Sequence, residues 1–365
     1  MKSYISYLFI FSFFLITSCT EDYQLPNLGS KTTIVITGMI TNEQGPYYVK
    51  VWENVSNIST GEFKKRGIND ARVTITDNSG NVDELRSFYT LEVDSVELIN
   101  PWGSGAELNY FHFYRIPGEE GNDDRLFFEA YRDHKYDPRD GNYFTTSTKG
   151  KPGQTYTLKV EYAGNEYTAT DYMCFGTVID SISLEPIGRH IYDNPDGTDG
   201  FLVPCAYFEE PQDETNFYMF EVYPYTQYNQ PPALNTYIAL KNLALKSDGN
   251  PDWHLSVISD RFLPSYVYQY KLSQGDSYLK YINGTDVWFS WLGDNNMVDG
   301  FYTNMYCISE PGYRYFAELS RQYYQDGGAF SPSPASPPTN FSGGAQGCFI
   351  AASVSQYGFY LRNEK

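Results

Sequence analysis

The chain has 365 residues, of which 41% are hydrophobic and 18% aromatic, and a formal net charge of −19. Its length fits about two domains, and its hydrophobic content supports packed cores and excludes wholesale disorder. The acidic balance excludes binding to nucleic acid or to an anionic membrane surface, because both need clustered Lys and Arg. The many Tyr residues suit half-buried sheet surfaces and contact surfaces alike.

Residues 1–18 have the layout of a secretory signal peptide, with one Lys near the start and then an apolar run. This run is too short for a convincing membrane-spanning helix. The sequence LITSC, which ends at Cys19, resembles the bacterial lipobox, in which the Cys becomes the first mature residue and is acylated with diacylglycerol and a fatty acid such as palmitate. Several acyl chains anchor a protein stably. Cys19 is therefore predicted as the lipidation site. The alternative is an ordinary Cys behind a cleaved signal peptide.

Two acids, Glu21 and Asp22, follow this Cys closely. They are similar to the surface-export signal of Bacteroidota lipoproteins, so we predict a lipid-anchored outer-membrane protein that faces the cell exterior. No Asp directly follows Cys19, so inner-membrane retention of the enterobacterial kind is not indicated. Residues 19–31 contain Pro and Gly without periodicity and are expected to form a lipidated tether.

Residues 32–173 predict an Ig-like β-sandwich, because short alternating or β-branched runs are separated by Gly-centred turns. Strands are expected at residues 32–40, 46–55 and 72–76, and a turn at 77–80. The clearest signal is a hairpin at residues 154–172. There, Gly164 and Asn165 are expected to supply the positive φ values of a tight turn after Ala163.

A long insertion at residues 94–149, rich in Asp, Gly, Arg and aromatic residues, interrupts this domain. Such a long loop inside a compact domain is usually functional or mobile. We expect its aromatic side chains to contact a partner, because Tyr and Trp give rigid contact area at a low entropy cost.

Residues 174–365 predict a second β-rich domain, with a boundary near residues 173–177. Candidate strands lie at residues 177–186, 200–208, 215–225, 235–243, 265–272, 285–293 and 300–309. One helix is expected near residues 312–326, because apolar residues form one stripe between Pro-Gly and Gly-Gly. That stripe consists of Tyr315, Phe316, Leu319 and Tyr323. A Pro/Ser/Gly loop then leads to a closing strand pair at 347–361, so the fold class is mainly β with one marked helix.

Five segments together resemble one known family: IVITGMITNEQGPYYVKV, NDARVTITDNSGN, KPGQTYTLKVEYAGNEYTA, TVIDSISLEP and, after the helix, PPTNFSGGAQGCFIAASVS. In this order they are similar to Bacteroidota lipoproteins of the family known as domain of unknown function 4249. The resemblance implies a partner, because members commonly sit beside TonB-dependent outer-membrane receptors, and it implies no catalytic residues. The insertion at 94–149, and Cys348 where an aromatic residue is more usual, depart from the family's pattern.

Four further cysteines lie in the second domain: Cys174, Cys205, Cys307 and Cys348. In an exported protein they allow two disulfides, with three pairings, and we expect at least one bridge. The alternative is that they are buried free thiols, because Cys packs well in a core. No CxxC spacing occurs, so a structural zinc site is not expected.

No metal site or cofactor is predicted. The histidines are scattered without an HExxH motif or close pairing; they are His112, His134, His190 and His254. The acidic segment at residues 193–200 could wrap Ca²⁺ with its oxygen ligands. It fails the EF-hand template, however, and lacks the downstream bidentate Glu, so a solvated acidic turn is the preferred interpretation.

The sequence also predicts no enzyme. No GxSxG elbow and no fitting SxxK context occurs. The adjacent acids Asp123-Asp124 and Glu209-Glu210 are candidate acid/base pairs. Neighbouring residues on a strand point to opposite faces, so Glu209 and Glu210 are not expected to face one substrate. A hydrolase with a novel site remains a third hypothesis, because it requires acids or histidines that cluster only in the fold.

Two short stretches, Asp94-Ser95-Val96 and Asp180-Ser181-Ile182, match the brief Bacteroidota O-glycosylation pattern of an acid, a hydroxyl residue and an aliphatic residue. Ser95 and Ser181 are therefore candidate O-glycosylation sites, at which a glycan adds surface bulk.

The leading interpretation is a cell-surface lipoprotein that acts as a non-catalytic accessory subunit of an outer-membrane complex. The expected partner is a TonB-dependent transporter or another outer-membrane complex. The alternative is a surface protein that binds a glycan or peptide on its own. Candidate stacking residues for that role are Trp102, Trp253, Trp288 and Trp291, although Trp in β proteins more often packs in the core.

Overall fold

The computed structural model describes residues 30–43, 45–57, 62–90, 92–99, 108–115, 126–130, 140–186, 200–225, 256–272, 278–282, 286–291, 294–297, 300–324 and 337–360. The chain divides into two compact units, residues 1–32 with 55–64 and residues 33–54 with 65–365. The cores and the candidate interaction surface described below lie in the second unit. Within the described ranges the fold is mainly β with one α-helix, which confirms the predicted class. No helix in these ranges is long and apolar enough to cross a membrane.

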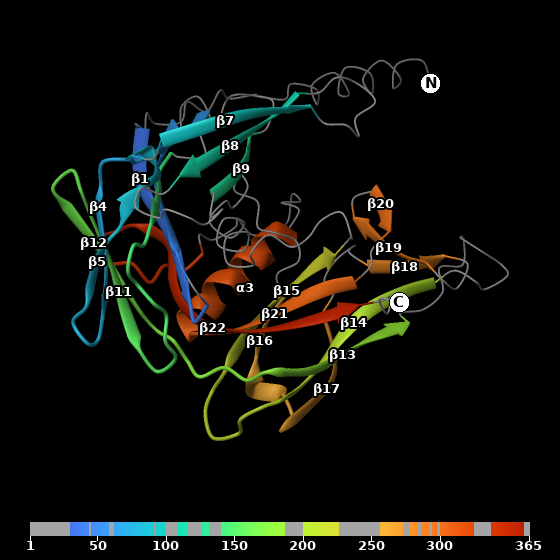
Figure 1. The fold of residues 1–365 in the computed structure, drawn as a ribbon. Coiled ribbons are helices and arrows are strands. Elements are labelled where there is room, and N and C mark those ends of the chain that lie inside the picture. The colour runs from blue at the N-terminus through green and yellow to red at the C-terminus, as the bar shows by residue number, and fades with distance from the viewer. Residues whose placement is uncertain are drawn as a thin grey trace, which may run out of the picture. The chain divides into compact units, whose positions relative to one another are not determined.

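A nine-stranded sheet is the largest element of the fold (Figure 1). Its strands, in spatial order, are β16 (Ser256–Ser259), β15 (Phe217–Tyr225), β21 (Gly300–Ile308), β22 (Gln346–Tyr360), β1 (Ser30–Thr41), β2 (Tyr48–Asn57), β10 (Asn142–Phe144) and β6 (Arg86–Ser87). β3 (Glu62–Gly67) pairs with β2. β22 runs parallel to β1 and antiparallel to β21, so one strand joins segments from the two ends of the chain.

A four-stranded sheet packs on the β1–β2 end of the large sheet and completes the predicted N-terminal sandwich. Its order is β12 (Asn165–Tyr172), β11 (Thr155–Tyr162), β4 (Arg72–Asp77) and β5 (Val82–Glu84). Alternate residues of each strand point inward, as the pattern of a half-buried sheet requires. Ile36 and Val51 of the large sheet meet Val73 and Leu158 of the small one in a fully buried apolar core.

The hairpin between β11 and β12 forms where the sequence predicts it, but its turn is shifted by one residue. Ala163 and Gly164 have φ values of 49° and 76°, whereas Asn165 is the first residue of β12. A two-residue hairpin turn of this kind needs positive φ at both central positions, so Ala163 takes the place expected for Asn165. The predicted turn at residues 77–80 also forms, with Gly80 at a φ of 86°.

The second sandwich uses the other end of the large sheet. A six-stranded sheet consists of β13 (Ile179–Pro186), β14 (Gly200–Glu209), β17 (Tyr266–Lys271), β18 (Tyr278–Ile282), β19 (Asp286–Trp291) and β20 (Asp294–Met297). Ile182 and Phe208 of this sheet pack against Phe220 and Met305 of β15 and β21 in a second buried core.

Helix α3 (Glu310–Tyr324) covers the opposite face of β15, β21 and β22. Tyr315 and Leu319 of its predicted apolar stripe pack on Tyr306 and Ile350. The helix begins two residues before the predicted 312 because Glu310 and Pro311 fit the first turn, where backbone N–H groups need no helical partner.

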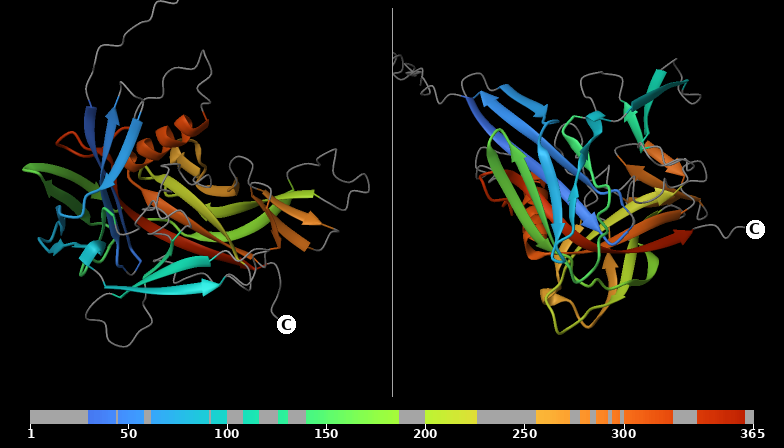
Figure 2. Two further views of the ribbon diagram at one scale, coloured as in Figure 1. Left: turned by 90° about the horizontal axis from the view of Figure 1, so that it is seen from above. Right: turned by 60° about the vertical axis from the view of Figure 1, so that its left-hand side comes forward.

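Strand β22 is shared by all three cores, and it corrects two sequence-based predictions. Residues 347–361 were expected to form a strand pair, but Gln346–Tyr360 is one strand of 15 residues. Its odd-numbered residues reach the first core at Phe349 and the second at Phe359, whereas Ile350 faces the helix. The predicted boundary at 173/174 therefore does not separate two self-contained sheets, because the last strand of the chain completes the first sandwich (Figure 2).

Polar side chains continue the hydrogen bonding of β22 where its neighbouring strands end. β1 pairs with it as far as Ala352, and Asn42 then bonds both the N–H and the C=O of Val354. On the other edge, Asn340 bonds the N–H and C=O of Phe349, and the Asp171 carboxylate accepts the N–H of Ala351 at 2.8 Å. Buried backbone groups need partners, so these side chains stand in for missing strand residues.

The predicted insertion at 94–149 is partly sheet. β7 (Glu92–Ile99), β8 (Leu108–Arg115) and β9 (Leu126–Ala130) form a three-stranded antiparallel sheet. Residues 140–149 belong to the sandwich instead, because β10 pairs with β2 and Tyr143 is buried in the first core. β10 is only three residues long, and a strand this short gives no periodicity that can be detected in the sequence.

Asp83 is hydrogen-bonded to residues 146–148, where the chain returns to the sandwich after β7, β8 and β9. Its buried carboxylate accepts the backbone N–H groups of Thr146, Ser147 and Thr148 at 3.0, 2.8 and 2.7 Å, and two Thr hydroxyls at 2.8 Å. Burial alone would raise the pKa of Asp83, but these hydrogen bonds lower it below the ordinary value.

Candidate interaction surface

The outer face of the six-stranded sheet carries the exposed aromatic residues of β14 and β17. Strand alternation sets this face: Ile182, Ala206 and Val267 point into the core, so their neighbours Ser181, Tyr207, Tyr266 and Tyr268 point outward. Tyr266 is 42% exposed and Tyr268 is 70% exposed. Phe262, in the 3₁₀ helix η3 (Asp260–Phe262) just before β17, is 87% exposed. Tyr207, Phe262, Tyr266 and Tyr268 are called the tyrosine face below.

The half-buried Tyr207 is held rigidly within this face. Its ring meets that of Tyr268 edge to face, with centroids 4.9 Å apart and planes at 89°. Its hydroxyl lies 3.0 Å from the Ser183 hydroxyl, which in turn donates to Glu185 at 2.7 Å. A ring that is already ordered loses little entropy when a partner binds.

A β-bulge places Tyr268 beside Tyr207. Phe208 pairs with Val267 and Ala206 with Tyr270, so two residues of β17, Tyr268 and Gln269, lie opposite Tyr207 alone. Gln269 has a φ of 55°, which is uncommon for a residue other than Gly. Bulges of this kind aim a side chain and end regular pairing at a sheet edge. Here the bulge keeps Tyr268 outward while Val267 and Tyr270 pack inward.

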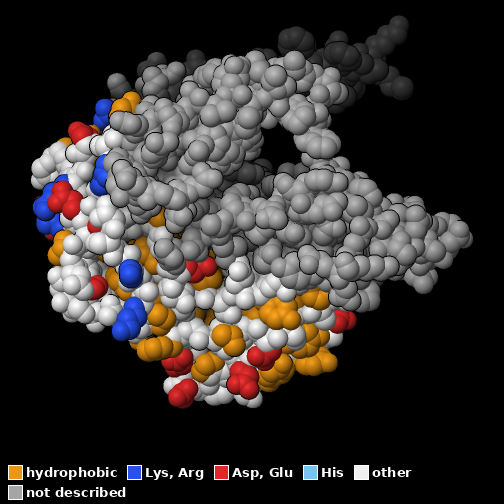
Figure 3. Space-filling view, in the orientation of Figure 1, with side chains coloured by type: hydrophobic (Ala, Val, Ile, Leu, Met, Phe, Trp, Pro, Cys, Tyr) orange, Lys and Arg blue, Asp and Glu red, His pale blue; other side chains and the backbone are white. Residues whose placement is uncertain are grey.

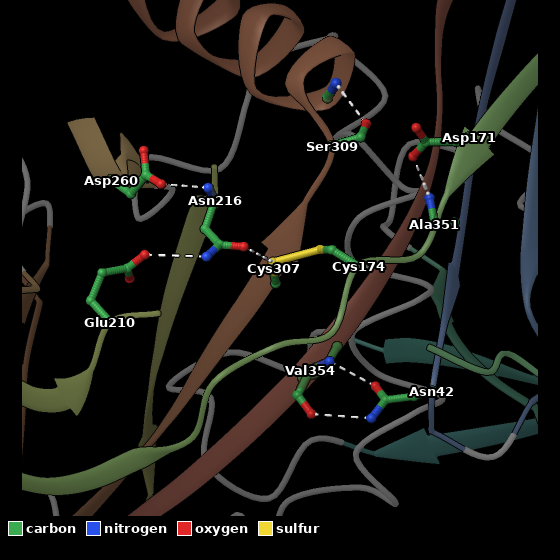
Figure 4. Close-up of a disulfide and its surroundings, with 11 residues drawn as sticks. Asn42, Asp171, Cys174, Glu210, Asn216, Asp260, Cys307, Ser309, Ala351 and Val354 are labelled. Carbon is green, nitrogen blue, oxygen red and sulfur yellow. Dashed lines mark hydrogen bonds between the residues drawn. A yellow bond between two sulfur atoms is a disulfide. The ribbon is translucent and has the colours of Figure 1, made fainter. Parts of the chain in front are cut away.

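Asn216 is hydrogen-bonded to Asp260, the first residue of η3, which also contains Phe262 (Figure 4). Its N–H donates to Asp260 Oδ2 at 2.6 Å, and the N–H of Asp260 donates back to the Asn216 C=O at 3.0 Å. The Asn216 amide donates to Glu210 Oε1 at 3.2 Å. Glu210 is 3% exposed, and burial raises the pKa of its carboxyl.

Asn216 also contacts a disulfide, which joins Cys174 to Cys307. Asn216 Oδ1 lies 3.7 Å from Cys307 Sγ (Figure 4). The Thr177 hydroxyl donates to the C=O of Glu209 at 2.7 Å, so the segment that enters β13 is fixed to the end of β14. These contacts hold the tyrosine face on a rigid base.

Two acids, Asp180 and Glu209, lie close to Tyr266 of the tyrosine face. The charged residues of β13, β14, the following loop and η3–β17 are Asp180, Glu185, Glu209, Glu210, Asp213, Glu214, Asp260, Arg261 and Lys271. Desolvation raises the pKa of the Tyr266 hydroxyl, and the negative charges of Asp180 and Glu209 raise it further. Orange hydrophobic and red acidic side chains intermix where β13 and β17 lie, whereas blue side chains gather over β4 and β11 (Figure 3).

A model of the family described as Domain of unknown function (DUF4249) matches residues 20–358. The chain belongs to the DUF4249 family. This confirms the family indicated by the sequence motifs. No curated protein and no solved structure matches the chain.

The arrangement found in this DUF4249 chain suits binding. In the part of the chain that the structure describes, no group of three or more His, Cys, Asp or Glu residues could hold a metal ion. Glu209 is exposed and Glu210 is buried, so the two acids face opposite sides of the sheet, as strand geometry predicts. Exposed aromatic rings on a rigid base, rimmed by carboxylates, can stack on and hydrogen-bond a partner.

The cysteines take both of the roles that the sequence leaves open. Cys174 and Cys307 form a disulfide, with Cα atoms 6.3 Å apart. Cys205 and Cys348 are buried free thiols. Burial raises the pKa of both thiols, so they are not reactive thiolates at neutral pH.

Several predicted residues lie outside the described ranges: Cys19, Glu21, Asp22, Trp102, Asp123, Asp124, His134, His190, Trp253 and His254, together with residues 193–199 and 235–243. Ser95 lies in β7, opposite His112 of β8, and Trp288 and Trp291 lie in β19. Ser181, the other candidate glycosylation site, pairs with Tyr207 on the outer face of β13 and β14.

Sequence reasoning recognised β17 as a strand but did not identify its Tyr residues as a surface. The segment Ser265–Leu272 alternates Tyr with other residues, so it shows which side chains share a face. It does not show that Val267 points into the core and that the Tyr side remains open. The pairing with Tyr207 also depends on the bulge, which has no clear sequence signal.

Proposed function

We propose that this chain is a lipid-anchored cell-surface protein that serves as a non-catalytic accessory subunit of an outer-membrane complex. Its preferred partner is a TonB-dependent transporter. Three observations support the proposal: the lipobox-like sequence at Cys19, the acids Glu21 and Asp22 after it, and membership of the DUF4249 family over residues 20–358.

The single observation that carries the binding role is the tyrosine face. Tyr266 and Tyr268 are exposed on β17, and Phe262 is exposed in η3 just before this strand. Exposed aromatic clusters of this kind mark contact sites on soluble domains. Tyr is also among the residues that dominate binding energy at protein interfaces, because it combines a large apolar ring with a polar end.

A lipid anchor at Cys19 strengthens such a contact without any additional area. A protein tethered to the same membrane as its partner meets it at a high effective concentration, so a modest face is sufficient for stable association. The residues between Cys19 and β1, which begins at Ser30 and so includes the last two residues of the predicted tether at 19–31, give the tether its reach.

Native purification tests this proposal. The full chain carries a C-terminal tag, is expressed in its own host and is purified in mild detergent, and co-purifying proteins are identified by mass spectrometry. We expect an outer-membrane barrel protein in near-stoichiometric amount. The variant Tyr207→Ser/Tyr266→Ser/Tyr268→Ser should lose it, whereas Lys159→Ser on the opposite sandwich should retain it. Recovery of the wild-type chain alone would contradict the proposal.

The anchor is tested separately. The Cys19→Ala variant should move from the membrane fraction to the soluble or precursor fraction, and the intact mass of the wild-type chain should match residues 19–365 plus lipid. An unacylated wild-type chain would contradict lipidation at Cys19, but it would not bear on the binding role of the tyrosine face.

A second candidate function, glycan binding by the chain alone, is favoured by one specific feature. The exposed Tyr rings share a sheet face with the hydroxyl of Ser183 and the carboxylate of Glu185, which are the groups that bind sugar hydroxyls. A glycan array probed with the mature chain distinguishes the two functions. Array binding that is lost in the triple Tyr variant, with no co-purifying barrel protein, would favour this second function.

A further inference from the structure

We propose that the tyrosine face receives Arg and Lys side chains of its protein partner, each held between an aromatic ring and a carboxylate. This inference rests on the proposed function and names the chemistry of the partner at the same surface. It follows from the charges around the face, from an internal contact of the same type, and from the shape of β17.

The acids near Tyr266 have no basic partner in the part of the chain that the structure describes. In the described ranges, Asp180 and Glu209 form no ion pair, although Asp180 accepts a hydrogen bond from the Tyr266 hydroxyl. Arg261 and Lys271 are the only basic residues on η3 and β17. Unpaired acids that surround an apolar face attract cationic side chains and repel anionic ones. The unpaired acids therefore select a basic partner.

The chain already contains one cation–π contact, which is half of the proposed arrangement. The guanidinium carbon of Arg261 lies 5.4 Å from the ring centroid of Phe262. A cation at this distance from an aromatic face is attracted by the negative π-cloud. Tyr266 and Tyr268 offer the same type of ring without an Arg of their own chain over it, as far as the described contacts show.

β17 argues against a partner that simply adds a strand to the sheet edge. It is six residues long, it contains the bulge at Tyr268 and Gln269, and it ends at Lys271. Short length, bulges and terminal Lys residues are the features that protect sheet edges from strand addition. The partner is therefore expected to bind through side chains on the face rather than through backbone pairing along the edge.

A charge-matched peptide pair tests the inference directly. The probe is an unstructured 12-residue Gly/Ser peptide with four Arg residues, and its control replaces each Arg by the neutral isostere citrulline. Binding to the detergent-solubilised mature chain is measured by fluorescence anisotropy. We expect the Arg peptide to bind about tenfold more tightly than the citrulline peptide, with an affinity that falls as salt rises.

Matched variants locate the site. Asp180→Asn/Glu209→Gln should reduce Arg-peptide binding about tenfold, whereas Glu84→Gln/Glu166→Gln, which removes two acids from the opposite sandwich, should not. Equal binding of the two peptides, or an equal loss in both double variants, would overturn the inference. Thermal unfolding of every variant verifies that the fold is retained.

The same variants separate this inference from the proposed function. A barrel protein that co-purifies with Asp180→Asn/Glu209→Gln as well as with the wild type, but not with the triple Tyr variant, would preserve the accessory role and overturn the cationic partner. Arg-selective peptide binding without any co-purifying barrel protein would support the cationic partner and overturn the accessory role. A neutral oligosaccharide that displaces the Arg peptide more strongly than added salt does would also contradict a cationic occupant.

Discussion

The outer faces of the two sandwiches differ in how their charges are satisfied. On the four-stranded sheet, Arg72 bonds Glu84 at 3.2 Å and Glu161 at 3.1 Å. Lys159 bonds the same Glu161 at 3.2 Å and Glu166 at 2.8 Å. On the six-stranded sheet, Asp180 and Glu209 lie near the exposed ring of Tyr266 and form no ion pair in the described ranges. The charges of the first face are therefore paired within the chain, whereas the second face has acids and aromatic rings that a partner can contact.

This difference shows that a shared architecture does not determine the role of a surface. Both sheets bury one face in an apolar core and alternate regularly along their strands. Cross-strand pairs of opposite charge satisfy a solvated face from within. Exposed Tyr rings gain most when a partner removes them from water. The following changes should affect the two faces differently, and they are ordered by the size of the expected effect.

Removing the disulfide should have the largest effect. In Cys174→Ser/Cys307→Ser the bridge that closes a separation of 133 residues is lost, which should lower the free energy of unfolding by about 4 kcal/mol. Chemical denaturation measures this loss. Hydrogen exchange should show the greatest gain near Asn216 and η3, with β4 and β11 still protected. Cys205→Ala, which removes a free thiol, is the control and should cost far less.

Asp83→Ala should destabilise the N-terminal sandwich by about 3 kcal/mol, because three backbone N–H groups lose a charged acceptor. The lowered pKa of Asp83 also gives a pH dependence. The folded carboxyl holds its proton less tightly than the unfolded one. Its contribution to the free energy of unfolding is therefore full above about pH 5, and it is lost as the pH falls below about 4 towards the lowered pKa of the folded carboxyl. Urea denaturation between pH 3 and 7 measures both effects.

The contribution of Asp171 should depend on pH in the opposite sense. Burial raises its pKa to about 6, although hydrogen bonds from Ser309 and the Ala351 N–H oppose the shift. The folded carboxyl binds its proton more tightly than the unfolded one, so stability should fall as pH rises from about 4 to about 6. Relative to Asp171→Asn, the free energy of unfolding of the wild type should fall by about 2 kcal/mol over this pH range. If denaturation curves of the two proteins shift in parallel, Asp171 is not the cause.

Arg72→Ala should have the smallest effect, because the ion pairs that it removes are exposed and screened. Its melting temperature should remain within about 2 °C of the wild type, and partner capture should be unchanged. A large loss of capture would show that the ion-paired face also binds, and the contrast between the two faces would then fail.

Regular elements could be predicted from the sequence because their periodicity is local. The hairpin at 155–172 and the helix around Tyr315 and Leu319 follow from alternation and from an apolar stripe. β22 was divided in two because its Gly, Ser and Gln residues weaken the alternation, although it is paired along its length by strands from both ends of the chain.

The candidate site could not be predicted because its contacts join distant segments. Tyr207 and Tyr268 meet only after β14 and β17 pair around a bulge. Asn42 bonds Val354 across 312 positions of sequence. The disulfide was one of several pairings that the composition allows, and the fold alone brings Cys174 to Cys307.

The most direct test of the central claim compares the two faces in one native purification. Tagged wild type, Tyr207→Ser/Tyr266→Ser/Tyr268→Ser, and Arg72→Ser/Lys159→Ser are purified in parallel, with equal yields verified. We predict that an outer-membrane barrel protein co-purifies with the wild type and with the Arg72/Lys159 variant, and falls at least tenfold, about the effect of losing two aromatic contacts, with the Tyr variant. Equal capture by all three proteins would contradict the assignment of the tyrosine face as the binding surface.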